Sequence, residues 1–500
     1  MNFDTWLPLF VVMSSLLPGL VMFFLNEGSH RLRTLLNMSG AVLKLVLVGI
    51  MTWGVFHEHI YEMRWTLAPG LELVLHADTL SVLFVILSTV LWLVTTVYAI
   101  GYLENSPHRS RFFGFFSLCV SATVGLALAG NLLTFVLFYE LLTLATYPLV
   151  AHRGTPEALR GARIYLAYTL SGGVLLFTGT VWLYSIAGSI PFVEGGTLNQ
   201  LDPDYHPQLM VIFLLMMTGL GVKAALVPLH GWLPQAMVAP APVSALLHAV
   251  AVVKAGAFGI IRVVYDVYGV EFTHQLGLLT GLGIIAAITI IYGSVKALSQ
   301  DNLKKRLAYS TVSQVSYIAL GIAILGPIGT IGGVVHLVHQ GIMKITLFFA
   351  AGNYAETLGI HKVSEMDGVG QRMPATTLAF SIAALGMIGV PPVAGYVSKW
   401  YLALGSLEAG MAWWVMPVLV ISSLLNAAYF LPVLYRAWFK QPATQWPHEK
   451  ILSSRFETQS ALLWPPLVTA ALAIAAGLFA ASPYSPLEWA ALIARREYGL

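Results

Sequence analysis

Long apolar stretches, separated by short polar segments, follow one another along nearly the whole chain. An α-helix needs roughly 20 apolar residues to cross a bilayer, so each stretch predicts one membrane span. Fourteen spans are predicted, at about 6–26, 34–56, 79–103, 112–130, 131–151, 162–188, 208–236, 242–266, 274–297, 303–326, 327–353, 375–401, 409–437 and 459–482. Residues 57–78 are too polar to span and alternate in polarity, which predicts a small extramembrane hairpin.

The composition points to the same class of protein. Of 500 residues, 57% are hydrophobic and 10% are charged, whereas soluble domains carry about 25% charged residues. We therefore predict an all-α polytopic membrane protein without a sizeable soluble domain. The single cysteine, Cys119, can neither pair within the chain nor hold an iron–sulfur cluster, so no redox cofactor is expected.

Basic residues fall mainly in alternate loops. Lys and Arg accumulate in cytoplasmic loops of membrane proteins. The loops after odd-numbered spans contain many of them, such as Arg31, Arg153 and Arg436, whereas the loops after even-numbered spans contain essentially Arg64. This asymmetry predicts an inner-membrane protein whose two termini both face the periplasm or outside.

Two predicted spans contain proline pairs that interrupt a helix: Pro228 and Pro234 in the seventh span, and Pro391 and Pro392 in the twelfth. Either pair alone is typical of an ordinary kink, but a lysine beside each break favours a midmembrane ion site between inverted repeats. The spacing of five spans predicts two inverted five-helix repeats, spans 4–8 and 9–13. The predicted segments are 1–111, 112–266 (first repeat), 267–440 (second repeat) and 441–500.

Five of the 26 basic residues lie inside predicted spans: Lys44, Lys223, Lys254, Lys344 and Lys399. A charge at a helix centre costs at least about 2.5 to 3.5 kcal/mol. Glu140 is the only acid well inside an apolar span, and we expect it to pair with Lys223 across the fifth and seventh spans. A static ion pair that fixes packing is the alternative, but the lysines that continue the row favour function. Lys44 lies outside the repeats and is expected to snorkel or pair locally.

Lysine suits proton transfer, because burial disfavours its charged form and a nearby carboxylate favours it. We predict Lys254 to be a relay. His248 lies six residues earlier, too far round the helix for a shared face, so a relay and a packing role stay equally open. His230, just beyond Pro228, either connects Lys223 to solvent or caps freed carbonyl groups, and the first role is slightly favoured.

The eleventh span carries His336, Gln340 and Lys344 at i, i+4 and i+8, with His339 beside them. Histidine both takes and gives a proton near neutral pH. A metal site is not expected, because two histidines without acidic or thiol ligands are too few. The tenth span adds a polar stripe able to hold water, which includes Ser310, Ser313, Gln314 and Tyr317. Lys399 ends the row and is the predicted exit.

The stretch from Lys223 to Arg262, together with 294–314 and GVPPVAGYVSKW at 389–400, resembles the antiporter-like subunits shared by Mrp-type cation/proton antiporters, respiratory complex I and membrane-bound hydrogenases. The resemblance implies fourteen helices, inverted five-helix repeats and a hydrophilic axis. It places Glu140, Lys223, Lys254, the eleventh-span histidines and Lys399 at the charged positions of the family. Lys399 resembles the lysine of the Mrp D subunit.

From these features we expect a proton-translocating, Mrp D-like subunit of a Na⁺/H⁺ or K⁺/H⁺ antiporter, with A-type and small subunits as partners. The alternative is a proton-pumping subunit of a redox-driven complex, in which case the assembly is a translocase. No phosphate-binding loop, HExxH motif or nucleophile elbow is present in the sequence, so a transporter subunit is expected rather than a catalyst. No bound cofactor or nucleic-acid partner is predicted.

Overall fold

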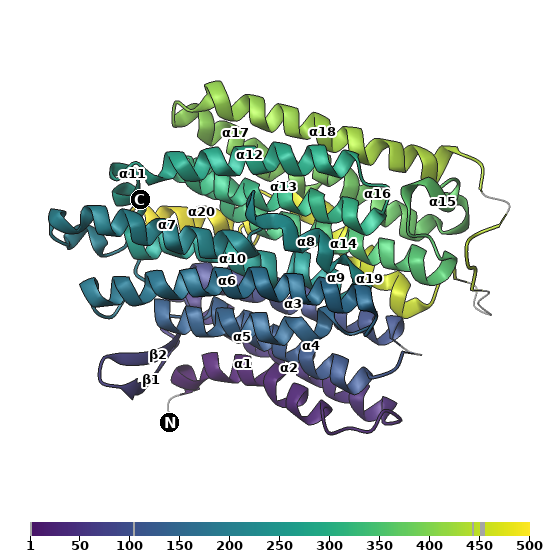
Figure 1. The fold of residues 1–500 in the computed structure, drawn as a ribbon, viewed down its shortest axis with the longest axis horizontal. Coiled ribbons are helices and arrows are strands. Elements are labelled where there is room, and N and C mark those ends of the chain that lie inside the picture. The colour runs from purple at the N-terminus through teal and green to yellow at the C-terminus, as the bar shows by residue number, and fades with distance from the viewer. Residues whose placement is uncertain (1–2, 104–105, 443–444, 451–455) are drawn as a thin grey trace.

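Helices make up almost all of the chain. The computed structural model describes residues 3–103, 106–442, 445–450 and 456–500. Most of the long helices run side by side along the longest axis of the molecule (Figure 1). The protein is therefore the multi-pass helical bundle that the apolar stretches predict.

The N-terminal part consists of three helices and a hairpin. Its elements are α1 (Phe3–Met22), α2 (His30–Phe56), β1 (Glu62–Ala68), β2 (Leu71–His76) and α3 (Thr79–Tyr102). The two strands pair antiparallel, with Trp65 opposite Leu73, which confirms the predicted hairpin. Asp78 follows β2 and accepts a hydrogen bond from the Ser81 backbone amide at 2.7 Å. This carboxylate thus caps α3 and starts the third helix directly after the hairpin.

The next helices lead to the first break. They are α4 (Arg109–Ala127), α5 (Leu132–Val150), α6 (Pro156–Ala187), η1 (Leu198–Gln200), η2 (Pro203–Tyr205) and α7 (His206–Lys223). The Asn131 and Thr155 side chains cap α5 and α6, since they accept hydrogen bonds from the backbone amides of Thr134 and Ala158.

Both predicted breaks are present. The seventh span stops at Lys223 and continues as η3 (Leu229–Gly231), α8 (Trp232–Gln235) and η4 (Ala236–Val238). The twelfth span consists of α16 (Pro374–Ile388) and α17 (Ala394–Glu408), separated by the Pro391–Pro392 segment. Proline lacks a backbone donor and clashes with the preceding turn, which explains why the helices stop there.

The eighth span is also broken, which the sequence did not lead us to expect. It consists of α9 (Ala241–Ala249), α10 (Val252–Arg262) and the π-helix η5 (Val263–Tyr268). At the break, the Ala251 amide donates to the Leu246 carbonyl at 2.9 Å, five residues back. Neither proline nor glycine marks this position, so local sequence gives no breaking signal.

The remaining elements complete the count of spans. They are α11 (Val270–Gln275), α12 (Leu278–Leu298), α13 (Leu303–Ala323), α14 (Pro327–Leu358), η6 (Val363–Glu365), α15 (Val369–Arg372), α18 (Ala412–Phe439), α19 (Ser460–Leu478) and α20 (Pro486–Glu497). In the described parts of the chain, 12 helices are long and apolar enough to cross a membrane. The other two predicted spans correspond to α13, whose first turn is basic, and to the divided pair α16 and α17.

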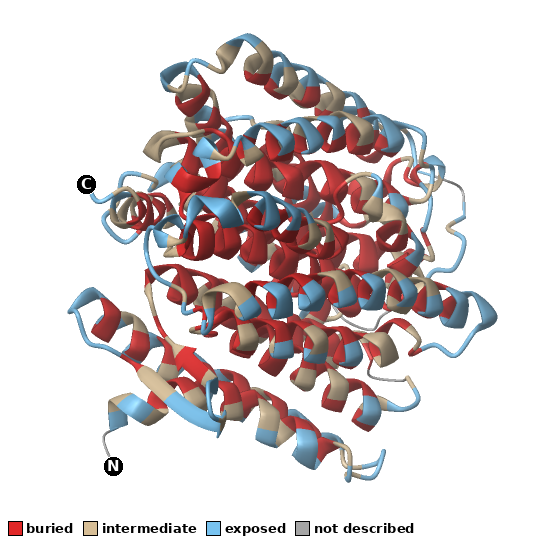
Figure 2. Cartoon of the chain, turned by 60° about the vertical axis from the view of Figure 1, so that its left-hand side comes forward, coloured by how far each residue is buried: buried red, intermediate tan, exposed pale blue. Residues whose placement is uncertain are grey.

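The core lies around α14, which packs against α9, α13, α16, α17, α19 and α20. The most apolar windows of α14 and of Ala241–Tyr268 are entirely buried, whereas those of α2, α6 and α18 are only one-third buried. Figure 2 shows the same division, with buried residues inside the bundle and exposed residues on the outer helices. Lysines on α10 and α14 therefore lie in the centre of the molecule.

The start of the first helix and the end of the last helix lie at the same end of the bundle. The start of α1, the hairpin and the end of α20 all lie at the left of Figure 1, and the end of α18 lies at the right. This arrangement agrees with an even number of crossings. Which end faces outside stays a prediction from the basic loops.

Candidate functional site: a buried row of charged and polar side chains

Lys223 is the last residue of α7 and is fully buried. Its ammonium group donates a hydrogen bond to the backbone carbonyl of Tyr139 on α5 and lies 3.3 Å from the centroid of the Tyr139 ring. A carbonyl oxygen and an aromatic face both stabilise a cation. The seventh span thus ends by placing a positive charge against the middle of α5.

Glu140 does not form the expected direct ion pair with Lys223 in the described structure. Its half-buried carboxylate lies against Gly173 of α6, where a side chain would overlap it. Consecutive helical residues point about 100° apart, so Tyr139 meets α7 while Glu140 faces α6. The two opposite charges still lie close enough to interact.

Side chains satisfy the backbone groups that the first break releases. The Val227 amide donates to Thr289 Oγ1 at 3.0 Å, and the Trp232 indole donates to the Val222 carbonyl at 2.7 Å. At membrane depth such groups need protein partners or water. His230 lies between the rings of Tyr292 and Tyr309, so it flanks the break from the side of α12 and α13.

Lys254 joins α10 to α14. It lies in the first turn of α10, beside the unexpected break, and donates to the Leu337 carbonyl at 2.6 Å. His248 lies on the other side of that break, stacked on Phe348 and 3.3 Å from the Met237 sulfur. The structure therefore does not bring His248 to Lys254, and its contacts are those of a packed side chain.

His336 stands between two lysines of the row. Its Nδ1 is 2.7 Å from the Ser398 hydroxyl of α17, and the ring lies close enough to Lys254 and Lys399 for their charges to act on it. His339 and Gln340 follow on α14, both fully buried. None of the side-chain nitrogen and oxygen atoms of His339 and Gln340 has a hydrogen-bond partner in the described structure. Such groups are rarely left unpaired in proteins, which points to internal water here.

Lys344 begins a connected chain of hydrogen bonds. Its ammonium donates to Ser310 Oγ of α13 at 2.8 Å, and Ser310 lies 2.9 Å from the Tyr429 hydroxyl of α18. The Tyr429 hydroxyl donates to Asn426 Oδ1 at 2.5 Å. Since an amide oxygen only accepts, the Ser310 hydroxyl donates to Tyr429. All donors in this chain therefore point from Lys344 towards α18.

Lys399 shares a carbonyl acceptor with the other end of this chain. Asn426 Nδ2 donates to the Met387 carbonyl at 3.2 Å, and the Lys399 ammonium donates to the same carbonyl at 3.1 Å and to that of Ile388 at 2.8 Å. Lys399 thereby caps the C-terminus of α16, where a cation is favoured by the helix dipole. The ring of Tyr317 lies near both the Lys399 ammonium and His336.

The row reaches an open cavity at Lys399. This cavity of about 490 Å³ lies between α17 and α18, and its lining includes Tyr396, Trp400, Ser423 and Leu424. Lys399 is 8% exposed, whereas Lys223, Lys254 and Lys344 are 0% exposed. The predicted exit residue is thus the member of the four with access to the surface.

Three polar residues differ from what the sequence led us to expect. Ser313 points away from the lysines and lies 2.9 Å from Ser294 of α12, so it does not join the row. Asn426 and Tyr429 were not predicted, although polar residues at 422, 426 and 429 repeat along one face of an apolar helix. In the described residues, no group of three or more His, Cys, Asp or Glu side chains could hold a metal ion.

These features define a polytopic membrane protein with a buried polar row between broken helices. Residues 129–426 match the family described as "NADH:quinone oxidoreductase/Mrp antiporter, TM", and residues 67–113 match "NADH-Ubiquinone oxidoreductase (complex I), chain 5 N-terminus". The first match covers more than half of the chain, so the protein belongs to this family. The antiporter-like identity inferred from the sequence motifs is thereby confirmed.

Individual relatives come from both branches. The chain is 36% identical over 432 residues to the N subunit of the NADH-quinone oxidoreductase of Desulforudis audaxviator, covering 84% of each chain. It is 26% identical over 479 residues to the D subunit of the Na(+)/H(+) antiporter of Bacillus subtilis, covering 94% of each. A chain of the Mrp complex from Dietzia sp. has the same fold, with a TM-score of 0.87, 23% identity and coverage of 100% and 98%.

Proposed function

We propose that this chain translocates protons through the membrane along the row formed by Glu140, Lys223, Lys254, the His336–Lys344 segment and Lys399. The observation that carries the proposal is the burial of four lysines inside the bundle, with polar side chains between Lys254, Lys344 and Lys399. Keeping such charges in a membrane interior is costly. Proton transfer would explain why each of these four lysines is kept there.

The contacts of the lysines support this role. In the described structure, no carboxylate lies within 4.0 Å of the Lys223, Lys254, Lys344 or Lys399 ammonium group. Each donates instead to neutral oxygen atoms. A lysine held only by neutral partners can lose its proton without leaving a buried carboxylate unpaired.

Two kinds of link connect the last three lysines of the row. Between Lys254 and Lys344, the unpaired polar atoms of His339 and Gln340 offer sites for water that can carry protons. Between Lys344 and Lys399, hydroxyl groups of Ser310 and Tyr429 lead to Asn426. In our proposal a proton that arrives near Glu140 changes the Glu140–Lys223 interaction. Protons then shift along the row to the cavity at Lys399.

We further propose that the proton flux is exchanged for Na⁺ or K⁺ in a complex with A-type and small antiporter subunits. The match to the D subunit of a Na(+)/H(+) antiporter over 94% of both chains supports this assignment. A lysine at position 399 supports it as well, because it resembles the lysine of Mrp D subunits. We place the complex in the inner membrane, with both termini of this chain outside.

A redox-driven complex is the second candidate. It is favoured by the 36% identity to the N subunit of an NADH-quinone oxidoreductase. In such an assembly the same row would be driven by electron transfer in other subunits, and this chain would still carry the protons.

The test is to purify the native assembly, identify its subunits and reconstitute it into vesicles with a pH gradient. The antiporter proposal predicts that Na⁺ or K⁺ collapses the gradient and that small antiporter subunits copurify. Proton movement that requires turnover of a quinone or another electron carrier, and not the cation, would favour the redox candidate. An intact assembly that shows neither cation-dependent nor electron-carrier-dependent proton movement would contradict the proposal of proton translocation.

A further inference from the structure

A second charged cluster lies at the end of the bundle where α20 ends. Arg262 at the end of α10 is 1% exposed and donates to Asp78 at 2.7 and 3.0 Å, to Asp266 at 2.8 Å and to Ser81 at 2.7 Å. This network joins α3, α10 and η5 without using any residue of the buried row. Its one guanidinium faces two carboxylates, so the cluster already carries net negative charge.

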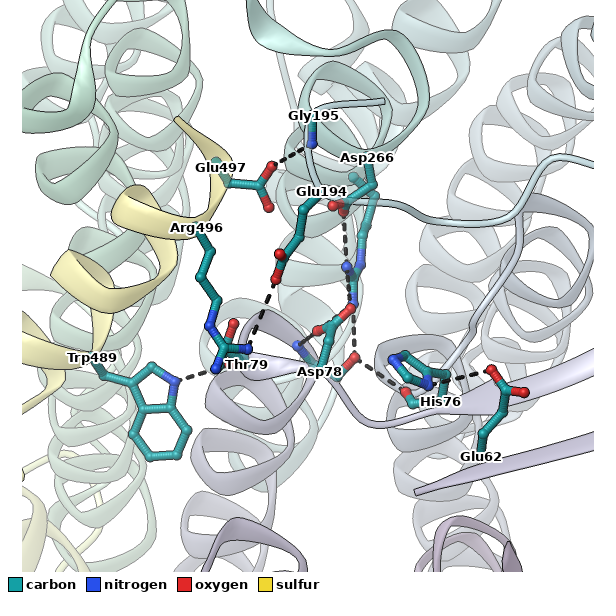
Figure 3. Close-up of polar contacts among 12 residues, drawn as sticks. Glu62, His76, Asp78, Thr79, Glu194, Gly195, Asp266, Trp489, Arg496 and Glu497 are labelled. Atoms are coloured by element: carbon teal, nitrogen blue, oxygen red, sulfur yellow. Dashed lines mark hydrogen bonds and ion pairs between the residues drawn. The ribbon is translucent and has the colours of Figure 1, made fainter. Parts of the chain in front are cut away.

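The C-terminal helix adds a third carboxyl group to this cluster. Figure 3 shows Glu497 of α20 with its carboxyl group turned towards Gly195 and Asp266. Its Oε2 accepts a hydrogen bond from the Gly195 amide at 3.3 Å, and the Glu497 residue is 8% exposed. The Glu497 and Asp266 carboxyl groups interact directly. Two buried carboxylates this close repel unless one of them holds a proton.

α20 lies across this end of the bundle as a strap. The Trp489 indole donates to the Thr79 carbonyl at 2.9 Å, and Arg496 lies 3.8 Å from Glu194. Tyr498 accepts a hydrogen bond from the Gly326 amide at 2.9 Å. These contacts tie the strap to the start of α3, to the loop before α7 and to the start of α14.

We propose that Glu497 is a protonation-controlled latch, which holds α20 against the bundle while it carries a proton and releases the helix when the proton is lost. The proton can sit between Glu497 and Asp266 as a hydrogen bond. Losing it leaves two facing carboxylates beside Asp78, with Arg262 as the shared cation. The basic loops predict that this end faces outside, so the latch responds to the pH on that side.

The charged and titratable groups around Glu497 belong to every element that packs there. They are Asp78 with His76 and Glu62 behind it, Glu194, Arg262, Tyr265, Asp266, Glu271, Arg496 and Tyr498. Burial alone would raise the pKa of Asp78, but the charge and hydrogen bonds of Arg262 outweigh it and lower that pKa to about 2. Asp78 therefore stays ionised and Arg262 stays engaged, which leaves the Glu497–Asp266 pair as the group that responds.

The sign of the pH effect follows from Glu497. Burial, together with the negative charge of Asp266, raises the pKa of Glu497 from 4.5 to about 9. The docked helix thus binds more protons than the released helix between these values. Docking is strongest below pH 4.5, weakens as the pH rises through this window, and changes no further above about pH 9.

The experiment measures docking by thiol labelling of the full chain in nanodiscs, in a Cys119→Ser background. One variant carries Ala494→Cys on the buried face of α20, and a matched variant carries Arg495→Cys on its exposed face. The ratio of the two labelling rates removes the pH dependence of the thiol itself. We expect this ratio to rise several-fold per pH unit between pH 6 and 9, to at most about tenfold per unit.

Two further variants complete the test. Glu497→Gln keeps the shape without the charge, so the ratio should stay low and independent of pH. Glu488→Gln removes the other acid of α20 and should keep the wild-type rise. A flat ratio in the wild type, or an equal rise in Glu497→Gln, would overturn the latch. Because labelling reports docking and not transport, either result leaves the proposed proton row untouched.

Discussion

The two broken spans hold their lysines in different ways. Lys223 ends α7 and donates to a carbonyl of α5, with Glu140 close enough to attract it. Lys399 follows the second break, caps the end of α16 and has only neutral partners. The first half thus contains a charge that can modulate its lysine. The second half contains a hydrogen-bonded chain that runs from Lys344 to the Met387 carbonyl, to which Lys399 also donates.

This difference assigns a direction of control to the row. A carboxylate beside Lys223 makes that lysine respond to protonation of Glu140, whereas Lys344 and Lys399 communicate through hydroxyl and amide groups. Substitutions that displace Glu140 should therefore change how transport depends on pH. Substitutions in the second half should change mainly its rate.

The largest effect is expected from Lys223. In reconstituted assemblies, both Lys223→Ala and Lys223→Arg should reduce proton flux by about 100-fold or more, because arginine keeps its charge and cannot release a proton. The matched control is Lys44→Ala, since Lys44 donates locally to Ser15 outside the row. If Lys223→Arg transports normally, Lys223 is a packing charge.

The second-largest effect on proton flux is expected from Tyr429→Phe. It removes the hydroxyl between Ser310 and Asn426, and we expect proton flux to fall by about 10- to 100-fold without loss of assembly. Ser310→Ala interrupts the same chain, so the double variant should transport no worse than the more impaired single variant. Additive losses would show that the chain does not act as one path.

Gly173→Val should have a smaller effect, confined to the first half. A Cβ at this position would come 2.9 Å from Glu140 Oε2 and displace the carboxylate. We expect a loss of about fivefold in flux, together with a shifted pH profile. Gly172→Val is unsuitable as a control because it would press on Val222, whereas Gly49→Val meets open space and should leave transport unchanged. An unshifted profile for Gly173→Val would argue against control by Glu140.

The smallest effect is expected from Ser313→Ala. Ser313 bonds Ser294 and not a lysine, so proton flux should stay within about twofold while the free energy of unfolding falls by about 1 kcal/mol. Measuring thermal unfolding and proton flux on the same preparation distinguishes a loss of stability from a loss of transport. A flux loss comparable to that of Tyr429→Phe would show that Ser313 takes part in proton transfer along the row.

The sequence predicted the parts of this structure that carry a large free-energy cost. Lysines in apolar spans and proline pairs inside helices are easy to recognise in a sequence, because each has a large free-energy cost in a membrane helix. The break between α9 and α10 was missed because neither proline nor glycine marks it. Tyr429 and Asn426 were missed because neutral polar residues cost less in a helix. The position of Glu140 towards α6 depends on helix rotation, which spacing along the chain does not determine.

The most direct test of proton movement along the row is Lys254, which joins the first half to α14 through the Leu337 carbonyl. Proton flux and subunit content should be measured on the same vesicles with Lys254→Met and with the wild type. The proposal predicts an intact assembly whose flux has fallen by about 100-fold or more. An intact Lys254→Met assembly that still carries protons at the wild-type rate would contradict it.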